Sequence, residues 1–80
     1  MTVRVKLFGP EAKAAGAREL EVRVNGQTCA ELRQALGQMS PALQPFLANA
    51  RFAVNHEFAS DGQTIAESDE IALIGMVSGG

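Results

Sequence analysis

The sequence contains neither tryptophan nor tyrosine, and its only aromatic side chains are four phenylalanines. Seven basic and nine acidic residues leave a net charge of −2, and no basic block occurs. Because nucleic-acid surfaces are normally basic, no nucleic-acid partner is expected. No apolar run approaches the roughly 20 residues of a transmembrane helix, and the alternating segment Met1–Lys6 is unlike a signal peptide. No membrane partner is expected either.

Cysteine and histidine occur once each, as Cys29 and His56. A lone cysteine forms no internal disulfide, which favours a reducing cytoplasm. Two interpretations of Cys29 are open: a reactive thiol at a helix start, or, the favoured one, a buried thiol on the apolar face of that helix. His56 follows Asn55 in an expected turn beside Glu57. Because a metal site needs three or four ligands, no metal and no bound cofactor are expected.

Eighty residues make one domain with a small core. Residues 3–8 alternate between an apolar and a more polar face and predict a strand, as do residues 20–24. Between them, Pro10 suits the first position of a short helix that ends at Ala15, and Gly16 suits its C-terminal cap. Asn25-Gly26 predicts a turn.

The main helix is predicted to begin at Thr28, which has capping-box spacing to Glu31. An apolar stripe then recurs at helical spacing and is expected in the core: Leu32, Ala35, Leu36 and Met39. Ser40-Pro41 ends the helix, because a residue before proline is disfavoured in helical geometry. The connection 42–50 carries apolar side chains that are expected to tuck beneath it: Leu43, Phe46 and Leu47.

Three short strands are expected in the remainder: 52–54, an edge strand at Phe58, and the mostly apolar segment 71–74, which suits a central position. The predicted fold class is α+β, a mixed sheet of about four to five strands with one main helix packed on one face. The predicted domain spans residues 1–75. Residues 76–80 are expected to form a flexible tail that ends in Gly-Gly.

The last residues of the sequence, Gly79 and Gly80, carry no side chains, so they can enter a narrow site and approach another backbone closely. A terminal α-carboxylate, with a reference pKa of about 3.5, is ionised at neutral pH. It can attack the α-phosphate of a nucleotide and become an acyl-adenylate. The alternative is an inert, frayed terminus.

The sequence resembles the sulfur-carrier family through four segments in order: Val5–Gly9, Phe52–Asn55, Asp69–Ile74 and Val77–Gly80. It is most similar to the small subunit of molybdopterin synthase, and the thiamine-pathway sulfur carrier is a cousin. The resemblance covers the whole chain and implies a β-grasp, ubiquitin-like fold with parallel first and last strands. The chain departs from the family at Ser68, usually glycine, and at Gly75-Met76, usually Pro-Pro, which should leave the tail looser.

The resemblance implies that an ATP-dependent adenylating enzyme, related to ubiquitin-activating enzymes, activates Gly80. A thiocarboxylate then forms on Gly80 and enters the large subunit of molybdopterin synthase, where sulfur moves to a pyranopterin precursor in molybdenum-cofactor biosynthesis. Gly79 is expected to allow passage through a narrow channel. The chain would thus be the sulfur donor within a sulfurtransferase, with no complete active site of its own, and ATP would be used by the partner.

Partner binding is expected along the tail and on the open face of the sheet. Val77 and Ser78 suit strand-like pairing in a partner groove, and Met76 suits an adaptable contact. Phe8 and Ile74 are expected on the outward face, although Phe8 packing under the following loop is an open alternative. Four acidic residues near the end of the sequence have two open interpretations, an acidic patch that binds a basic partner or a plain solvated loop. They are Asp61, Glu67, Asp69 and Glu70.

Three other functions remain open. The chain could carry sulfur for thiamine or another thio-metabolite. It could be a ubiquitin-like modifier joined to lysines through Gly80. It could also be a β-grasp interaction module with an inert tail.

Overall fold

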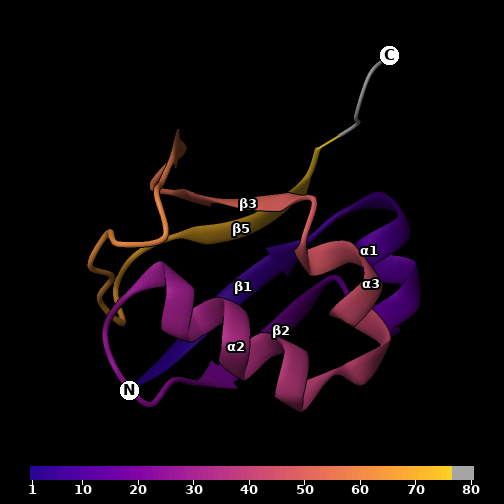
Figure 1. Cartoon of the computed structure of the whole chain (residues 1–80), viewed down its shortest axis with the longest axis horizontal. Helices are drawn as coiled ribbons and strands as arrows, with labels where there is room; N and C mark the ends of the chain where they lie inside the picture. Colours follow the sequence, from indigo (N-terminus) through magenta and orange to yellow (C-terminus); the bar gives the residue numbers. More distant parts are fainter. Residues whose placement is uncertain (77–80) are drawn as a thin grey trace.

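The computed structural model describes residues 1–76 of the chain. A five-stranded sheet in the order β2-β1-β5-β3-β4 is covered on one face by helix α2, Cys29–Met39 (Figure 1). The other elements are β1 Thr2–Leu7, α1 Gly9–Ala15, β2 Glu19–Arg23, the 3-10 helix η1 Pro41–Leu43, α3 Gln44–Leu47, β3 Ala50–Val54, β4 Glu57–Phe58 and β5 Ile71–Gly75. The predicted α+β class is confirmed. None of the described helices is long and apolar enough to cross a membrane.

The centre of the sheet is the parallel pair of β1 and β5, in which Val5 lies opposite Ile71 and Leu7 opposite Leu73. β2 pairs antiparallel with β1, and β3 pairs antiparallel with both β5 and β4. This is the β-grasp topology that the resemblance implies, and β4 is the short edge strand expected at Phe58. The topology places the end of β5 beside the start of β3, where Ala50 lies opposite Gly75.

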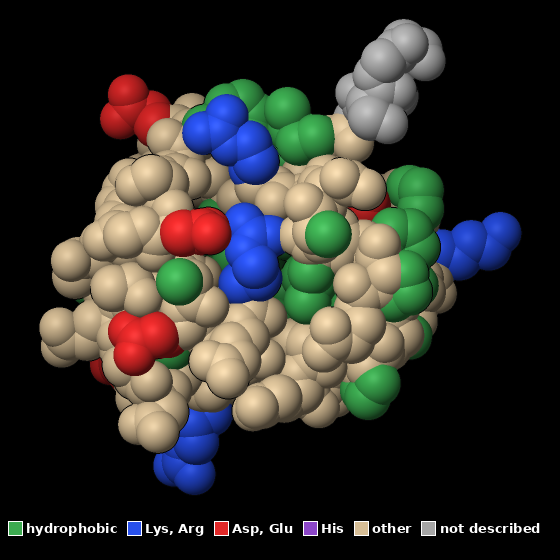
Figure 2. Space-filling model, in the orientation of Figure 1, with side chains coloured by type: hydrophobic (Ala, Val, Ile, Leu, Met, Phe, Trp, Pro, Cys, Tyr) green, Lys and Arg blue, Asp and Glu red, His purple; other side chains and the backbone are tan. Residues whose placement is uncertain are grey.

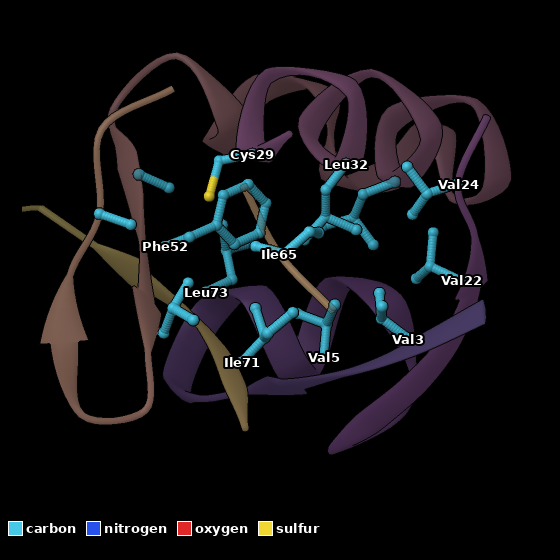
Figure 3. Close-up of a cluster of buried hydrophobic side chains, with 14 of the residues drawn as sticks. Val3, Val5, Val22, Val24, Cys29, Leu32, Phe52, Ile65, Ile71 and Leu73 are labelled. Atoms are coloured by element: carbon cyan, nitrogen blue, oxygen red, sulfur yellow. The ribbon is translucent and has the colours of Figure 1, made fainter. Parts of the chain in front are cut away.

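The core lies between the sheet and the helices (Figure 3). Its largest fully enclosed side chains come from α2, η1 and four of the strands: Phe52, Leu32, Leu36, Leu43, Ile71, Leu73, Val3, Val5, Val22 and Cys29. Burying a side chain of this size contributes about 1.5–3 kcal/mol. Alternate residues of β1 are exposed, so one face of the sheet is core and the other is open.

Local signals in the sequence explain where the helices begin and end. Thr28 Oγ1 accepts from the Glu31 amide at 3.3 Å, while the Glu31 carboxylate accepts from the Thr28 amide at 3.1 Å, which confirms the capping box. Gly16, at φ +73°, closes α1 in the left-handed conformation, as expected of a C-terminal cap.

Two expectations about the helices need correction. Met39 is 50% exposed and not part of the core, because it is the last residue of α2 and the apolar stripe extends one turn too far. The connection 42–50, in which no helix is predicted, contains the end of η1 and the whole of α3. Leu43 and Leu47 are buried there as expected, and Phe46 is half-buried.

Candidate functional site

The end of β5 is the point at which the described structure reaches the predicted tail. The Met76 amide donates to the Asn49 carbonyl at 2.8 Å, so the strand pairing with the start of β3 continues one residue past Gly75. Met76, expected to contact a partner, is 42% exposed. The other predicted tail residues, Val77, Ser78, Gly79 and Gly80, lie outside the described residues.

Beneath this strand end lies Glu11, which is 6% exposed and is the only buried charged residue within 1–76. It comes from α1, which lies near the end of β5 (Figure 1). A Cβ atom at Gly75 would stand 2.3 Å from Glu11 Oε1, so the carboxylate fills the space that a side chain at position 75 needs. In the sequence, Glu11 lies within the predicted short helix that begins at Pro10. No local pattern reports its burial, because that depends on how α1 packs.

Arg33 of α2 fixes the chain corner that leads to β3. Its Nη1 atom donates to the carbonyls of Leu47 and Ala50, the latter at 2.9 Å. Nη2 pairs with Asp61 at 3.1 Å, and the guanidinium lies 5.4 Å from the centre of the Phe52 ring. Because Asn49 lies between the two acceptor residues, Arg33 helps to position the carbonyl that binds Met76. Sequence reasoning missed this role.

The open face of the sheet has an apolar part beside the end of β5. Strand register places Lys6, Ala72, Ala53 and Phe58 in one row across the face. A shallow hollow there brings together the two predicted docking residues, Phe8 and Ile74, with Lys6, Ala53, Ala72, His56 and Glu70 around them. Phe8 is 55% exposed, so the alternative that it packs under the following loop is wrong.

The other part of the open face is acidic. A second hollow is lined by residues of β1, β2, the turn before β5 and the start of β5: Thr2, Arg4, Lys6, Glu19, Glu21, Glu67, Ser68, Asp69, Glu70 and Ile71. Glu70 pairs with His56 Nε2 at 3.0 Å and with Lys6 Nζ at 3.9 Å. The histidine is therefore an exposed turn residue, as expected, but the carboxylate it contacts is Glu70 and not Glu57.

The predicted acidic patch is divided in the structure. Asp69 accepts from the Ala66 amide at 2.8 Å and from Asn55 Nδ2 at 3.0 Å, which holds the turn before β5. Asp61 instead pairs with Arg33. On the helix-covered face, acidic and basic side chains are interspersed with no large block of one charge (Figure 2).

The Cys29 thiol is fully enclosed, and its side chain belongs to the core cluster (Figure 3). Burial raises the pKa of this thiol, the negative charge of Asp61 raises it further, and Arg33 opposes the shift. The prediction of a buried thiol is confirmed. Within residues 1–76, no group of histidine, cysteine, aspartate or glutamate side chains could hold a metal ion.

Comparisons with known proteins agree with this architecture. SAMP1 from Haloferax volcanii is 32% identical over the whole of both chains, with a TM-score of 0.83. A chain from the protein–protein complex of subunits 1 and 2 of the molybdopterin-converting factor from Helicobacter pylori is 25% identical over the whole of both chains, with a TM-score of 0.68. A molybdopterin-converting factor subunit 1 from Pyrococcus furiosus, 20% identical over 96% of this chain and 99% of its own, has the same fold with a TM-score of 0.82.

Comparison with curated proteins found no match. The model of the ThiS family matches residues 5–80, which is nearly the whole chain and includes Gly79 and Gly80. The chain therefore belongs to the ThiS family, the sulfur-carrier family that its sequence resembles.

Proposed function

We propose that the chain is a sulfur carrier that acts as the small subunit of molybdopterin synthase, with Gly80 as the residue that carries sulfur. The observation behind this is the family match, which runs through Gly79-Gly80. The similarity to a chain from a two-subunit molybdopterin-converting factor supports a partner subunit of the same kind.

The proposed chemistry begins with a carboxylate, which is a poor acyl donor. The Gly80 carboxylate attacks the α-phosphate of ATP in an adenylating enzyme, pyrophosphate leaves, and an acyl-adenylate forms. A persulfide attacks the acyl carbon and displaces AMP, and a thiol reductant then cleaves the S–S bond to leave the thiocarboxylate. In the large subunit, the thiocarboxylate sulfur displaces an oxygen substituent from a carbon of the pyranopterin precursor, and water then cleaves the acyl C–S bond, which restores the Gly80 carboxylate. Lysine and arginine groups for these steps come from the partners.

The fold supports this proposal by placing the end of β5 at an edge of the molecule. Six residues from Gly75 to Gly80 reach at most ~20 Å, enough to enter a narrow channel. In the proposal, Gly79 permits passage, Val77 and Ser78 pair with a partner groove, and Met76 contacts its rim. The exposed apolar group of Phe8 and Ile74 binds the body of the partner.

The test is the intact mass of the protein after incubation with host extract, ATP and a sulfur source. We expect a gain that matches replacement of one oxygen by sulfur, and fragmentation should place it at Gly80. A variant with one alanine added after Gly80 is the matched control and should fold but not gain mass. An unchanged wild-type mass in an extract that thiocarboxylates a known carrier would contradict the proposal.

A second candidate function is a ubiquitin-like protein modifier, favoured by the 32% identity to SAMP1 over the whole chain. In this case the Gly80 acyl group would be joined to lysine amines of other proteins. Epitope-tagged chain in host cells would then give higher-mass conjugates that are absent for the alanine-extended variant. A cytoplasmic location, predicted from the sequence, remains a prediction.

A further inference from the structure

Glu11 is a charged side chain in a place where folding alone favours an apolar one. It is 6% exposed, yet its carboxylate makes no hydrogen bond or ion pair with any residue of 1–76. Taking a carboxylate out of water without a partner is costly, and an apolar side chain of similar volume is often more stabilising. The charge therefore points to a group outside the described chain.

The Glu11 carboxylate remains accessible to such a group. Within the described chain, the only fully enclosed side-chain nitrogen or oxygen without a hydrogen-bond partner is Arg33 Nε. Since the Glu11 oxygens also lack a partner, they must retain some contact with solvent. They lie against Gly75, in the space that a side chain at this position would need. Glu11 thus presents an almost buried carboxylate, 6% exposed, at the end of β5.

The position of Glu11 relates it to the tail. Along β5, Ile74 faces the open side of the sheet while Gly75 faces the helix side, where Glu11 lies. A protein that binds the chain at the end of β5, where the predicted tail begins, therefore meets an apolar surface on one face of β5 and the Glu11 carboxylate on the other. The side chain that complements this carboxylate is a long one with a cationic end, which can reach an almost buried group.

We propose that Glu11 binds an arginine or lysine side chain that the protein accepting the tail inserts beside Gly75. The inference rests on the proposed function, because it requires a partner that binds the tail. The resulting ion pair is largely shielded from water. Through this ion pair the partner recognises the end of β5 independently of the chemistry at Gly80. The pair also offsets the free-energy cost of burying the Glu11 carboxylate without a partner.

The test compares Glu11→Gln with Glu57→Gln in the full chain. Both variants remove one negative charge, but Glu57 is exposed on β4 opposite Val54, away from the row of open-face residues, and serves as the control for net charge. Affinity is measured by calorimetry, at low and high salt, for the purified adenylating enzyme and the purified large subunit of the same host. We expect Glu11→Gln to bind at least one of them about tenfold or more weakly and to keep its melting temperature, and Glu57→Gln to bind within about twofold.

Two outcomes would overturn the inference, and they differ in what they say of the proposed function. Equal affinity of Glu11→Gln and wild type for both proteins removes the role of Glu11 and leaves the carrier function intact. Failure of the wild type to bind either protein, with no mass gain in extract, removes the proposed function and the inference with it. If Glu11→Gln proves unstable, Glu11→Leu, which replaces the carboxylate by an apolar group of similar size, provides the same comparison.

Discussion

The carboxylate of Glu11 occupies the space in which a side chain at position 75 would stand. An ideal Cβ on Gly75 lies 2.3 Å from Oε1 and 2.9 Å from Oε2 of Glu11. Gly75 does not need glycine for its backbone, because its φ lies outside the left-handed range that favours this residue. The close approach of Glu11 gives a structural reason for glycine at position 75, where the family usually has proline.

A substitution at Gly75 should therefore depend on the residue at position 11. We expect Gly75→Ala to lower the free energy of unfolding by about 1–3 kcal/mol, because the added methyl group displaces an almost enclosed side chain. In a Glu11→Ala background, the same substitution should be neutral or stabilising by about 0.4–1 kcal/mol, since alanine restricts the unfolded chain more than glycine does. Urea unfolding of the four proteins measures the coupling. Additive effects would show that the two residues do not compete for space.

Among the lysines and arginines of the described chain, Arg33 should contribute most to the free energy of unfolding. Arg33→Met removes the donor to two carbonyls, those of Leu47 and Ala50, and each buried acceptor left unpaired costs about 1–3 kcal/mol. We expect a loss of about 3 kcal/mol in urea unfolding. Arg23→Met, at an exposed position of β2, is the control and should change stability by less than about 0.5 kcal/mol. Similar values for the two variants would show that Arg33 does not hold the corner.

The same residues show what could be read from the sequence. Alternation in residues 3–8 and the capping box at Thr28 are local patterns, and both predicted their elements, although Phe8 lies just after β1. The burial of Glu11 and the contacts of Arg33 depend on where α1 and α3 pack, and no local spacing reports this. Met39 shows where a local pattern misleads. Its spacing continues the apolar stripe and so predicts burial, but α2 ends at Met39 and the side chain is 50% exposed.

The capping box should make stability depend on acid. The amide of Gln27, then the hydroxyl and the amide of Thr28, hold the pKa of Glu31 below its ordinary value of 4.5. A depressed folded-state pKa contributes stability that is present above the unfolded value and is lost as pH falls through the folded value. Wild type should thus exceed Glu31→Gln in stability at neutral pH, and the difference should shrink below pH 4.5. Urea unfolding across this range measures it, and a constant difference would contradict the assignment.

Cys29 should be unreactive in the folded protein. Burial raises the pKa of its thiol, so the thiolate that reacts with alkylating reagents is scarce as well as inaccessible. We expect alkylation with iodoacetamide to be slow in buffer and to accelerate strongly in unfolding concentrations of urea. The control is Cys29→Ala combined with Ala30→Cys, which moves the thiol to the adjacent exposed position and should react quickly in buffer. Equally fast reaction of wild type would indicate an open or reactive site.

Partner binding should depend on the open face of the sheet and not on exposed apolar surface in general. Phe8 lies in the hollow with Ile74, whereas Met39 ends α2, and the two are similarly exposed at 55% and 50%. We expect Phe8→Ala to weaken binding to the large subunit by about 2 kcal/mol, roughly thirtyfold, as for a central aromatic contact, and Met39→Ala to leave it unchanged. Calorimetry measures both, and melting curves should show little change in stability. If the two variants bind alike, docking does not use this face, and the proposed contact of Ile74 fails with that of Phe8.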